Sequence, residues 1–283
     1  MGATQLVLVT GATGFIGRAT VNAVASAGWK TVKASRSAGA SRPEGSAWLD
    51  LADPATLFAM AGKVRFDAIV HLGARVGLAD ETESELYVPN VLSTGCLAYL
   101  ARLWDAHLIF ASTAIVHGSR QETIQADSPL CLDTAYARSK WLAEQLIAAS
   151  GARHCVLRIA GVFGSSGPAH LGLNRAIDAI GNGIPPLVIG SGKALRNYIY
   201  VKDAAEAIVC ALRKGIEGTH LLAGHEVLSI GEMMRELCNA FLPGWHPATK
   251  DGPEASNQVI RPSAFLPVTR GFRDALADMR GLD

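Results

Sequence analysis

Short apolar runs alternate along the chain with longer segments in which apolar residues recur at helical spacing. The short runs, which are typical of strands, cover residues 6–9, 31–35, 66–73, 107–112 and 154–160. The segments with helical periodicity between them cover residues 15–27, 54–62, 86–105 and 134–150. This β-α-β-α alternation predicts an α/β fold with a doubly wound parallel sheet of the Rossmann type.

The pattern changes after about residue 161, where Gly and Pro become frequent and loops separate the helical segments. These later segments cover residues 170–181, 203–213, 229–241 and 272–280. We therefore predict a larger domain in residues 1–165, to which residues 197–224 return, and a smaller C-terminal lobe built from residues 166–196 and 225–283.

Composition narrows the classes of partner. The 283 residues carry a net charge of +1, with 18% charged residues, so no strong field marks a nucleic acid or a membrane surface as the partner. No apolar run approaches the roughly 18 residues of a membrane span, and the N-terminus lacks the features of a signal peptide. The five cysteines are widely spaced without a CxxC pair, so we expect free thiols and no metal site. The sequence thus predicts a cytoplasmic protein that acts on a small molecule.

The stretch TGATGFIG, residues 10–17, joins the first predicted strand to the first predicted helix. Such a turn aims backbone N–H groups and the positive end of a helix at one point, which suits a pyrophosphate. Gly11 would allow the tight turn, Gly14 the close approach of the phosphates, and Gly17 the close packing of helix on strand. We predict that the larger domain binds a dinucleotide here and that the smaller lobe binds the substrate.

The end of the second predicted strand indicates which dinucleotide binds. Sites for NAD(H) place an acidic residue there to hold the ribose 2′-hydroxyl, but this chain has Ser35 and Arg36. A hydroxyl and a guanidinium would attract a 2′-phosphate, so the sequence favours NADP(H) over NAD(H). Asp50 follows another apolar pair, and it is suited either to accept a hydrogen bond from an adenine amino group or to begin the helix near residue 54.

Tyr136 and Lys140 begin a helical segment at a spacing that places both on one helix face. A phenol with a pKa of about 10 is a poor base near neutrality, and a neighbouring ammonium lowers that pKa. Ser112 and Thr113 lie at the carboxyl end of the strand predicted at residues 107–112, where doubly wound sheets bind ligands. Either hydroxyl could share a proton with a substrate oxygen, so these residues predict a site of proton transfer.

Together these motifs resemble the extended short-chain dehydrogenase/reductase superfamily, specifically its NAD-dependent epimerase/dehydratase branch. The resemblance covers nearly the whole chain, and its motifs, in order, are TGATGFIG, HLGA (71–74), STAIVHG (112–118), YARSK (136–140) and LRIAGVFG (157–164). It implies a nicotinamide cofactor, a nucleotide-sugar substrate and a homodimer formed through the helices at 86–105 and 134–150.

The resemblance also implies a role for each matching residue. Because His117 stands where the family has a tyrosine, counting back from it makes Thr113 the catalytic hydroxyl, with Tyr136 as acid/base and Lys140 as the residue that binds the nicotinamide ribose and tunes the tyrosine. Together with the glycine-loop and strand-end arguments above, it gives as cofactor contacts Gly11, Thr13, Gly14, Phe15, Ile16, Gly17, Ser35, Arg36, Asp50, Leu51, Leu72, Gly73, Ala74 and Asn90, besides Tyr136 and Lys140. The implied substrate contacts are Ser112, Thr113, His117, Arg196 in RNYIYVKDAAEAI and Arg261 in IRPS, with the two arginines on a diphosphate.

Four positions depart from the family pattern, namely Arg75, Val76, Gly161 and His117. They predict a substrate pocket different from that of a UDP-galactose 4-epimerase. The histidine at 117 is more typical of a packing or hydrogen-bonding residue than of an acid/base group.

The sequence therefore predicts an NADP(H)-preferring oxidoreductase that acts on a nucleotide-activated sugar, with reduction of a 4-keto group as the main hypothesis. In that reaction hydride passes to the ketone carbon, Tyr136 donates a proton to the oxygen, and Thr113 holds that oxygen. The first alternative is a 4-epimerase on the same substrate class, and the second is a reductase of a non-nucleotide ketone or aldehyde. Ser35 and Arg36 favour the ketoreductase, because a net reducer draws on NADPH.

Overall fold

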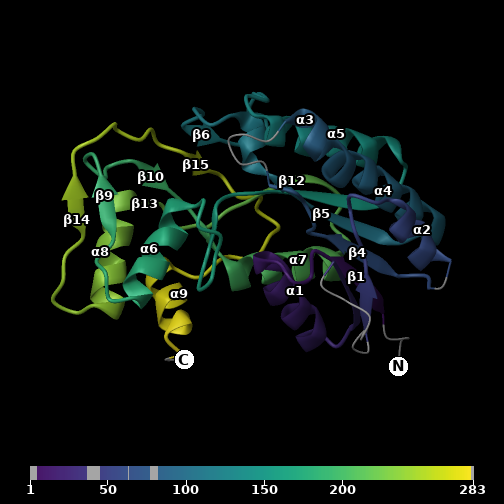
Figure 1. The fold of residues 1–283 in the computed structure, drawn as a ribbon, viewed down its shortest axis with the longest axis horizontal. Helices are drawn as coiled ribbons and strands as arrows, with labels where there is room; N and C mark the ends of the chain where they lie inside the picture. The colour runs from purple at the N-terminus through teal and green to yellow at the C-terminus, as the bar shows by residue number, and fades with distance from the viewer. Residues whose placement is uncertain (1–4, 37–44, 63, 77–81, 282–283) are drawn as a thin grey trace. The chain divides into compact units, whose positions relative to one another are not determined.

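A computed structural model describes residues 5–36, 45–62, 64–76 and 82–281 (Figure 1). Within these residues the largest sheet has seven strands in the order β12-β7-β5-β4-β1-β2-β3. The four pairs that link β3 to β5 through β2, β1 and β4 are parallel. The strands are β1 Leu6–Thr10, β2 Lys30–Ser35, β3 Ser46–Trp48, β4 Ala68–His71, β5 His107–Thr113, β7 His154–Ile159 and β12 Gly218–Leu222. The predicted doubly wound α/β sheet is confirmed, and its order reverses between β1 and β4.

The helices that follow the first strands lie close to their predicted positions, with one difference. They are α1 Phe15–Ser26, α2 Ala55–Ala61, α3 Glu83–Leu86, α4 Ser93–Trp104 and α5 Ala135–Ala149, with a π-helical turn η1 Tyr87–Leu92 and a 3-10 turn η2 Ala114–His117. The helix predicted at 86–105 is therefore wrong as one regular α-helix. Pro89 lies inside η1 and has no N–H to donate, which breaks the regular ladder there.

Apolar side chains of the sheet and of α4 and α5 form the main core of the first unit. Phe66 and Trp104 meet edge to face with ring centroids 5.4 Å apart. Fully buried members of this core include Leu8, Leu57, Ile69, Leu97, Leu108, Phe110 and Ile147. A buried sheet of this kind fixes where each strand ends, and those ends carry the candidate site residues.

The chain divides into two compact units. The first comprises Met1–Ser119, Pro129–Arg158 and Ala205–His220, and the second comprises Arg120–Ser128, Ile159–Ala204 and Leu221–Asp283. These bounds differ from the predicted ones at residues 120–128, 159–165, 197–204 and 221–224, which all belong to the second unit. In the first of these segments, β6 Thr123–Ile124 pairs with β15 Val259–Ile260. In the second, β8 Val162–Phe163 pairs with β11 Ile199–Tyr200 of the third.

The second unit contains short strands and four helical elements in its part of the described chain. The helices are α6 Gly172–Gly181, the start of α7 Val201–Lys214, α8 Ile230–Phe241 and α9 Phe272–Met279, each within two residues of its predicted range. The remaining strands are β9 Leu187–Ile189, β10 Leu195–Arg196, β13 Leu228–Ser229 and β14 Ala248–Lys250. No helix among the described residues is long and apolar enough to cross a membrane.

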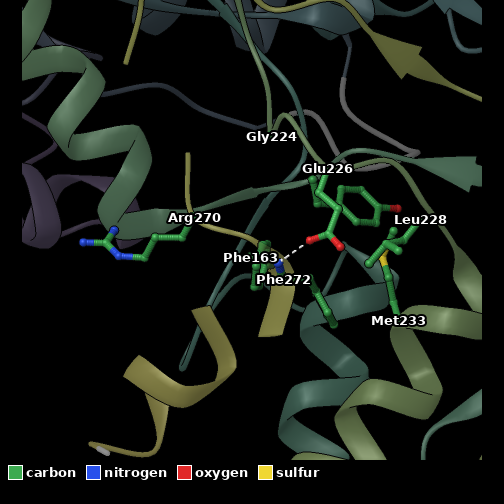
Figure 2. Close-up of a pocket in the computed structure, with 8 residues that line it drawn as sticks. Phe163, Gly224, Glu226, Leu228, Met233, Arg270 and Phe272 are labelled. Atoms are coloured by element: carbon green, nitrogen blue, oxygen red, sulfur yellow. Dashed lines mark hydrogen bonds between the residues drawn. The ribbon is translucent and has the colours of Figure 1, made fainter. Parts of the chain in front are cut away.

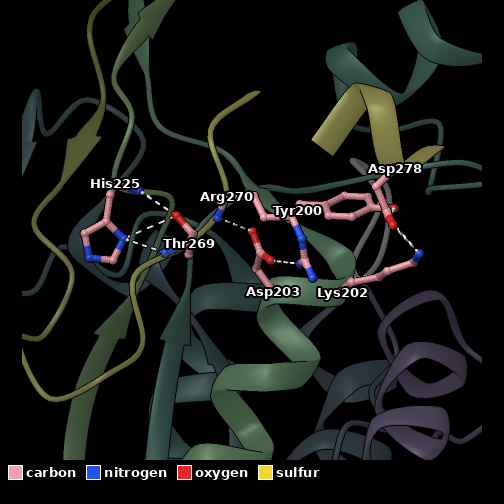
Figure 3. Close-up of polar contacts among 7 residues, drawn as sticks. All are labelled: Tyr200, Lys202, Asp203, His225, Thr269, Arg270 and Asp278. Carbon is pink, nitrogen blue, oxygen red and sulfur yellow. Dashed lines mark hydrogen bonds and ion pairs between the residues drawn. The ribbon is translucent and has the colours of Figure 1, made fainter. Parts of the chain in front are cut away.

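Polar contacts fasten the C-terminal segment to the start of α7 (Figure 3). Buried Asp203 accepts a hydrogen bond from the backbone N–H of Arg270 at 2.9 Å and pairs with its guanidinium. Asp278 of α9 accepts from the Tyr200 hydroxyl at 2.5 Å and from Lys202 Nζ at 2.8 Å. These contacts hold α9 and the segment before it against the start of α7.

Candidate active site

The glycine loop after β1 packs backbone against backbone. Gly11 has a φ of +67°, and a Cβ added to it would lie 2.6 Å from the backbone N of Gly73. A Cβ on Gly17 would overlap the Gly11 carbonyl oxygen, so α1 approaches the strand as closely as the sequence predicts. A Cβ added to Gly73 would lie 2.7 Å from the Leu51 side chain. The structure therefore gathers predicted cofactor residues from three strand ends, where the glycines allow close packing. A glycine turn that leads into a helix N-terminus suits a pyrophosphate.

The rest of the loop is partly exposed. Thr13 and Gly14 are exposed, while Phe15 and Ile16 are half-buried at the first turn of α1. The Gly14 N–H donates to the Gly11 carbonyl at 2.9 Å, which closes the turn. The first turn of α1 contains no acidic side chain that would repel an anion, so its positive end suits a phosphate.

The residues predicted to contact the adenosine ribose and the adenine lie at or after the ends of β2 and β3. Arg36 is exposed directly after β2, and Ser35 is half-buried as its last residue. Asp50 Oδ1 accepts the backbone N–H of Ala52 at 3.0 Å, whereas Asp53 Oδ1 accepts that of Ala55 at the start of α2. Of the two acids, Asp53 is the one that bonds to the helix start, which favours the adenine contact for Asp50.

Asn90 ties the loop after β4 to the helix that carries Tyr136. Its Oδ1 accepts the Arg75 backbone N–H at 2.8 Å, and its Nδ2 donates to the Arg75 carbonyl at 2.8 Å and to Ser139 Oγ at 3.1 Å. Ser139 in turn donates to the Tyr136 carbonyl at 2.8 Å. Asn90 is buried, and these bonds make it part of the scaffold between Leu72–Arg75 and α5.

The three predicted catalytic residues lie in the first unit on two neighbouring elements. Thr113 ends β5 and is buried, and its Oγ1 accepts the Ile115 backbone N–H at 3.3 Å. Tyr136 is half-buried in the first turn of α5, which begins where Thr134 Oγ1 accepts a backbone N–H. Lys140 is buried one turn later, with its Nζ 4.0 Å from the centre of the Phe110 ring of β5. The lysine is therefore directed at the strand that ends in Thr113.

Burial sets the ionisation of this site. It lowers the pKa of Lys140 to about 7, against a smaller opposing effect of Glu144, and it raises the pKa of Tyr136 to about 12. The expected lowering of the tyrosine pKa by Lys140 is not found, because loss of water around the phenol dominates. An acid/base role for Tyr136 thus needs a further positive charge or hydrogen-bond donor at the phenol.

His71 is held neutral beside the site. Its Nδ1 lies 2.6 Å from Thr10 Oγ1, and its Nε2 lies 2.9 Å from Thr94 Oγ1. Burial, followed by the charge of Lys140, lowers its pKa to about 3. The two threonine contacts give this histidine a structural role.

Ser112 and His117, the other predicted substrate contacts of the first unit, are both buried and bonded to protein groups. Ser112 Oγ donates to Glu144, and His117 lies 3.1 Å from a nitrogen of Arg158. Sequence reasoning missed Glu144 and Arg158. A signal was present, since Glu144 shares the face of α5 with Tyr136 and Lys140, and Arg158 interrupts an apolar strand.

The two predicted diphosphate-binding arginines lie on paired segments of the second unit. Asn197 accepts the Ile260 backbone N–H at 3.0 Å and donates to the Ile260 carbonyl at 2.6 Å. Arg196 precedes this asparagine, and Arg261 follows this isoleucine. Arg196 donates to the Ser256 carbonyl at 2.6 Å, and the Arg261 side chain is exposed.

A small pocket in the second unit was not expected from the sequence (Figure 2). It is lined by Phe163, Tyr198, Gly224, Glu226, Leu228, Met233, Arg270 and Phe272. The Arg270 side chain turns away from Glu226, whose carboxylate accepts the Phe272 backbone N–H at 2.5 Å.

A Cβ on Gly161 would lie 2.5 Å from the Tyr198 ring, which explains why glycine replaces the family's usual asparagine there.

Comparison with known proteins places these features in context. The model of the NAD dependent epimerase/dehydratase family matches residues 7–225. A probable UDP-glucuronate 4-epimerase of Rhizobium meliloti (strain 1021) is 30% identical over 171 residues, which cover 56% of this chain and 49% of that protein. UDP-glucose 4-epimerase 4 of Oryza sativa subsp. japonica is 27% identical over 287 residues, covering 85% of this chain and 76% of that protein. The chain thus spans about half the length of the first relative.

The fold is shared with a solved structure as well. The crystal structure of the Bordetella bronchiseptica enzyme WbmH in complex with NAD+ matches with a TM-score of 0.83 at 21% identity, over 99% of this chain and 98% of that one. At this identity the match establishes the fold alone.

Replacing Lys140 by Met is expected to stabilise the protein while removing the ammonium from the site. Between pH 7 and pH 10.5 the unfolded chain holds a proton on Lys140 that the native protein does not, so the native protein gains stability as pH rises through this window. At pH 6 it carries the full cost of the buried charge. The melting temperature of Lys140→Met should therefore exceed that of the wild type by several degrees at pH 6, with a difference that shrinks toward pH 10.

Lys250→Met serves as the control, since it removes an exposed lysine from β14. Its melting temperature should stay close to that of the wild type. A Lys140→Met protein that melts below the wild type at pH 6 would contradict this account of the buried ammonium.

Proposed function

Because the chain belongs to the NAD-dependent epimerase/dehydratase family, whose model matches residues 7–225, we propose that it is a nucleotide-sugar 4-epimerase. The branch expected from the sequence motifs is confirmed. The observation that carries the proposal is the placement of Tyr136 and buried Lys140 on one face of α5, with the lysine against the strand that ends in Thr113. This is the arrangement that moves a proton at a sugar hydroxyl.

Each of the candidate catalytic residues has its own role in such a reaction. Tyr136 removes the proton from the sugar 4-hydroxyl and later returns it, and Thr113 Oγ1 holds the same oxygen through a hydrogen bond. Because burial raises the pKa of Tyr136 to about 12, its phenolate needs a positive charge or hydrogen-bond donor in addition to Lys140. The glycine cradle around Gly11 and Gly17 would hold a dinucleotide. When bound, its nicotinamide supplies the acceptor and donor of the hydride, so that the sugar is oxidised and then reduced on its opposite face.

The comparisons favour epimerisation over the net reduction that the sequence put first. The two curated relatives described above are named 4-epimerases. A 4-ketoreductase would use the same three residues and differ in consuming one NADPH per turnover. The ketoreductase is therefore kept as the second candidate.

The substrate class rests on the second unit. Arg196 and Arg261 flank the two hydrogen bonds between the Asn197 side chain and the Ile260 backbone, which hold the segments of both arginines together. Two guanidinium groups on such segments suit a diphosphate, with which each can form charge-assisted hydrogen bonds. We therefore retain a nucleotide-activated sugar as the substrate.

The test incubates the purified protein and catalytic NAD+ or NADP+ with UDP-glucose, UDP-glucuronate and UDP-N-acetylglucosamine, and identifies the products by NMR. The expected product is the 4-epimer with no net change in nicotinamide absorbance. Tyr136→Phe should bind the cofactor as the wild type does and lose at least about 100-fold in kcat, because the phenol transfers the proton. Near wild-type turnover by that variant would remove Tyr136 from the mechanism.

Two other outcomes discriminate the alternatives. Stoichiometric oxidation of NADPH by a 4-keto sugar would identify the ketoreductase instead. If Arg196→Ala combined with Arg261→Ala left the KM for every nucleotide sugar unchanged, the arginines would not hold a diphosphate. Absence of turnover with every nucleotide sugar would instead favour a reductase of a non-nucleotide ketone or aldehyde.

The preference for NADP(H) rests on Arg36 and Ser35 alone. We expect Arg36→Gln to weaken NADP+ binding about tenfold or more, through the loss of charge-assisted hydrogen bonds to a 2′-phosphate, and to leave NAD+ binding nearly unchanged. Titration calorimetry with both dinucleotides measures this difference. Arg102→Gln, at an exposed position near the end of α4, is the control. Equal effects on both cofactors would show that Arg36 does not recognise a 2′-phosphate and would remove the basis for the NADP(H) preference; WbmH was crystallised in complex with NAD+.

An exposed apolar face on α4 and α5 supports a homodimer. Tyr99 and Leu103 of α4 are 58% and 63% exposed, and Leu142 and Leu146 of α5 are each 40% exposed. Gly95 brings the two helices together, since a Cβ on it would lie 3.0 Å from the Leu146 side chain. Because the stripes of the two helices adjoin, a second copy could cover both through a two-fold interface.

Leu103→Glu is expected to convert this dimer into a monomer, because a carboxylate would be buried against the second copy. Light scattering coupled to gel filtration gives the mass of each form. Val268→Glu introduces the same charge at an exposed apolar residue of the second unit and should leave the mass unchanged. A monomeric wild type would contradict the proposed dimer.

A further inference from the structure

A continuous chain of polar contacts connects four elements of the first unit. Ser112 of β5 donates to Glu144 of α5. Glu144 pairs with Arg158 of β7, with 2.7 Å between Nη2 and Oε2 and 3.2 Å between Nε and Oε1. Arg158 Nη1 lies 3.1 Å from His117 Nε2 in η2, and His117 Nδ1 lies 3.1 Å from the Pro129 carbonyl.

The partners of His117 fix its protonation. A carbonyl oxygen can only accept, so Nδ1 carries the hydrogen and donates to Pro129. A guanidinium can only donate, so Nε2 carries no hydrogen and accepts from Arg158. His117 is therefore a neutral imidazole in one tautomer, and it replaces the family's tyrosine as a link in this chain rather than as an acid.

The ion pair at the centre of the chain is shielded from water. The side chains of Glu144 and Arg158 are 4% and 14% exposed, respectively. Each group makes several charge-assisted hydrogen bonds, so neither can move without leaving a buried charge incompletely paired. The ion pair thus holds α5 and β7 in one relative position.

In sequence, Thr113 lies between Ser112 and His117, the two members of this chain of polar contacts that come from β5 and η2. Ser112 immediately precedes it, His117 follows four residues later, and both bond to the same ion pair. Within α5, Lys140 lies four residues and Tyr136 eight residues before Glu144, so the three side chains share one face of the helix. The chain of polar contacts therefore connects Thr113, which would hold the substrate oxygen, to α5, which carries Tyr136 as the residue that would transfer the proton.

We propose that the Arg158–Glu144 ion pair, acting through Ser112 and His117, positions Thr113 relative to Tyr136 and Lys140. Glu144, Arg158, Ser112 and His117 are then positioning residues. This inference rests on the proposed function, in which the three catalytic residues act on one sugar hydroxyl. Small errors in such an alignment cost rate rather than affinity.

Two substitutions of His117 separate its two contacts. In His117→Gln the side-chain oxygen can replace Nε2 and accept from Arg158, whereas in His117→Asn the amide nitrogen can replace Nδ1 and donate to Pro129. If the contact with Arg158 positions Thr113, His117→Asn should lose at least about tenfold in kcat, with KM and cofactor affinity close to wild type. His117→Gln should stay near the wild-type kcat.

Ser112→Ala provides a second variant that leaves the ion pair intact. It removes only the hydroxyl that bonds to Glu144, and it should also lower kcat without changing cofactor affinity. Ser150→Ala, which removes a hydroxyl hydrogen bond from the far end of α5, is the matched control and should retain full activity. Equal kcat in both His117 variants, or losses confined to KM, would overturn the proposal.

A measurement without substrate separates this proposal from the proposed function. The 13C-methyl resonance of Thr113, assigned with Thr113→Val, should shift in His117→Asn and remain near its wild-type position in His117→Gln. If the wild type turns over no nucleotide sugar but these shifts differ as expected, the function is wrong and the positioning holds. If the resonance responds equally in both variants, the positioning is wrong whatever the substrate.

Discussion

Burial of the Lys140 ammonium is the constraint on which the arrangement of the first unit depends. Its neighbours suit a cation that has lost its water: Phe110 offers a ring face, His71 stays neutral, and Glu144 carries the opposite charge. The same carboxylate is bound to Arg158, and through it to the strands of the sheet. The packing of α5 and the ionisation of its catalytic face are therefore properties of one polar cluster.

Much of the fold could be predicted from the sequence, because parallel strands buried between helices leave contiguous apolar runs, and because Gly11 stands where only a positive φ closes the turn. Candidate residues at strand ends followed from the same logic. Three features could not be predicted in this way. The Glu144–Arg158 pair joins residues 14 positions apart across two elements, the Tyr136 pKa depends on burial rather than on helical spacing, and the bounds of the two units depend on short strands that pair distant segments.

Two of the four departures from the family pattern, Gly161 and His117, fit local neighbours in the structure. Gly161 is small because the Tyr198 ring occupies the space of its side chain. His117 replaces a tyrosine and contacts both a carbonyl oxygen and a guanidinium, a pairing that a neutral imidazole can satisfy with its two nitrogens. Each of these two departures is thus understood from a neighbour distant in sequence, and a motif scored position by position does not contain that information.

The π-helical turn η1 limits how this part of the chain can vary in length. A π-helical turn accommodates one residue more than an α-helical turn, so η1 acts as a one-residue insertion within the helical stretch from Glu83 to Trp104. Deleting one residue would restore a regular ladder and rotate the preceding side chains by about 100° relative to α4. Asn90 would then lose Arg75 or Ser139. The position of Asn90 in this protein therefore depends on the length of the segment as well as on its residues.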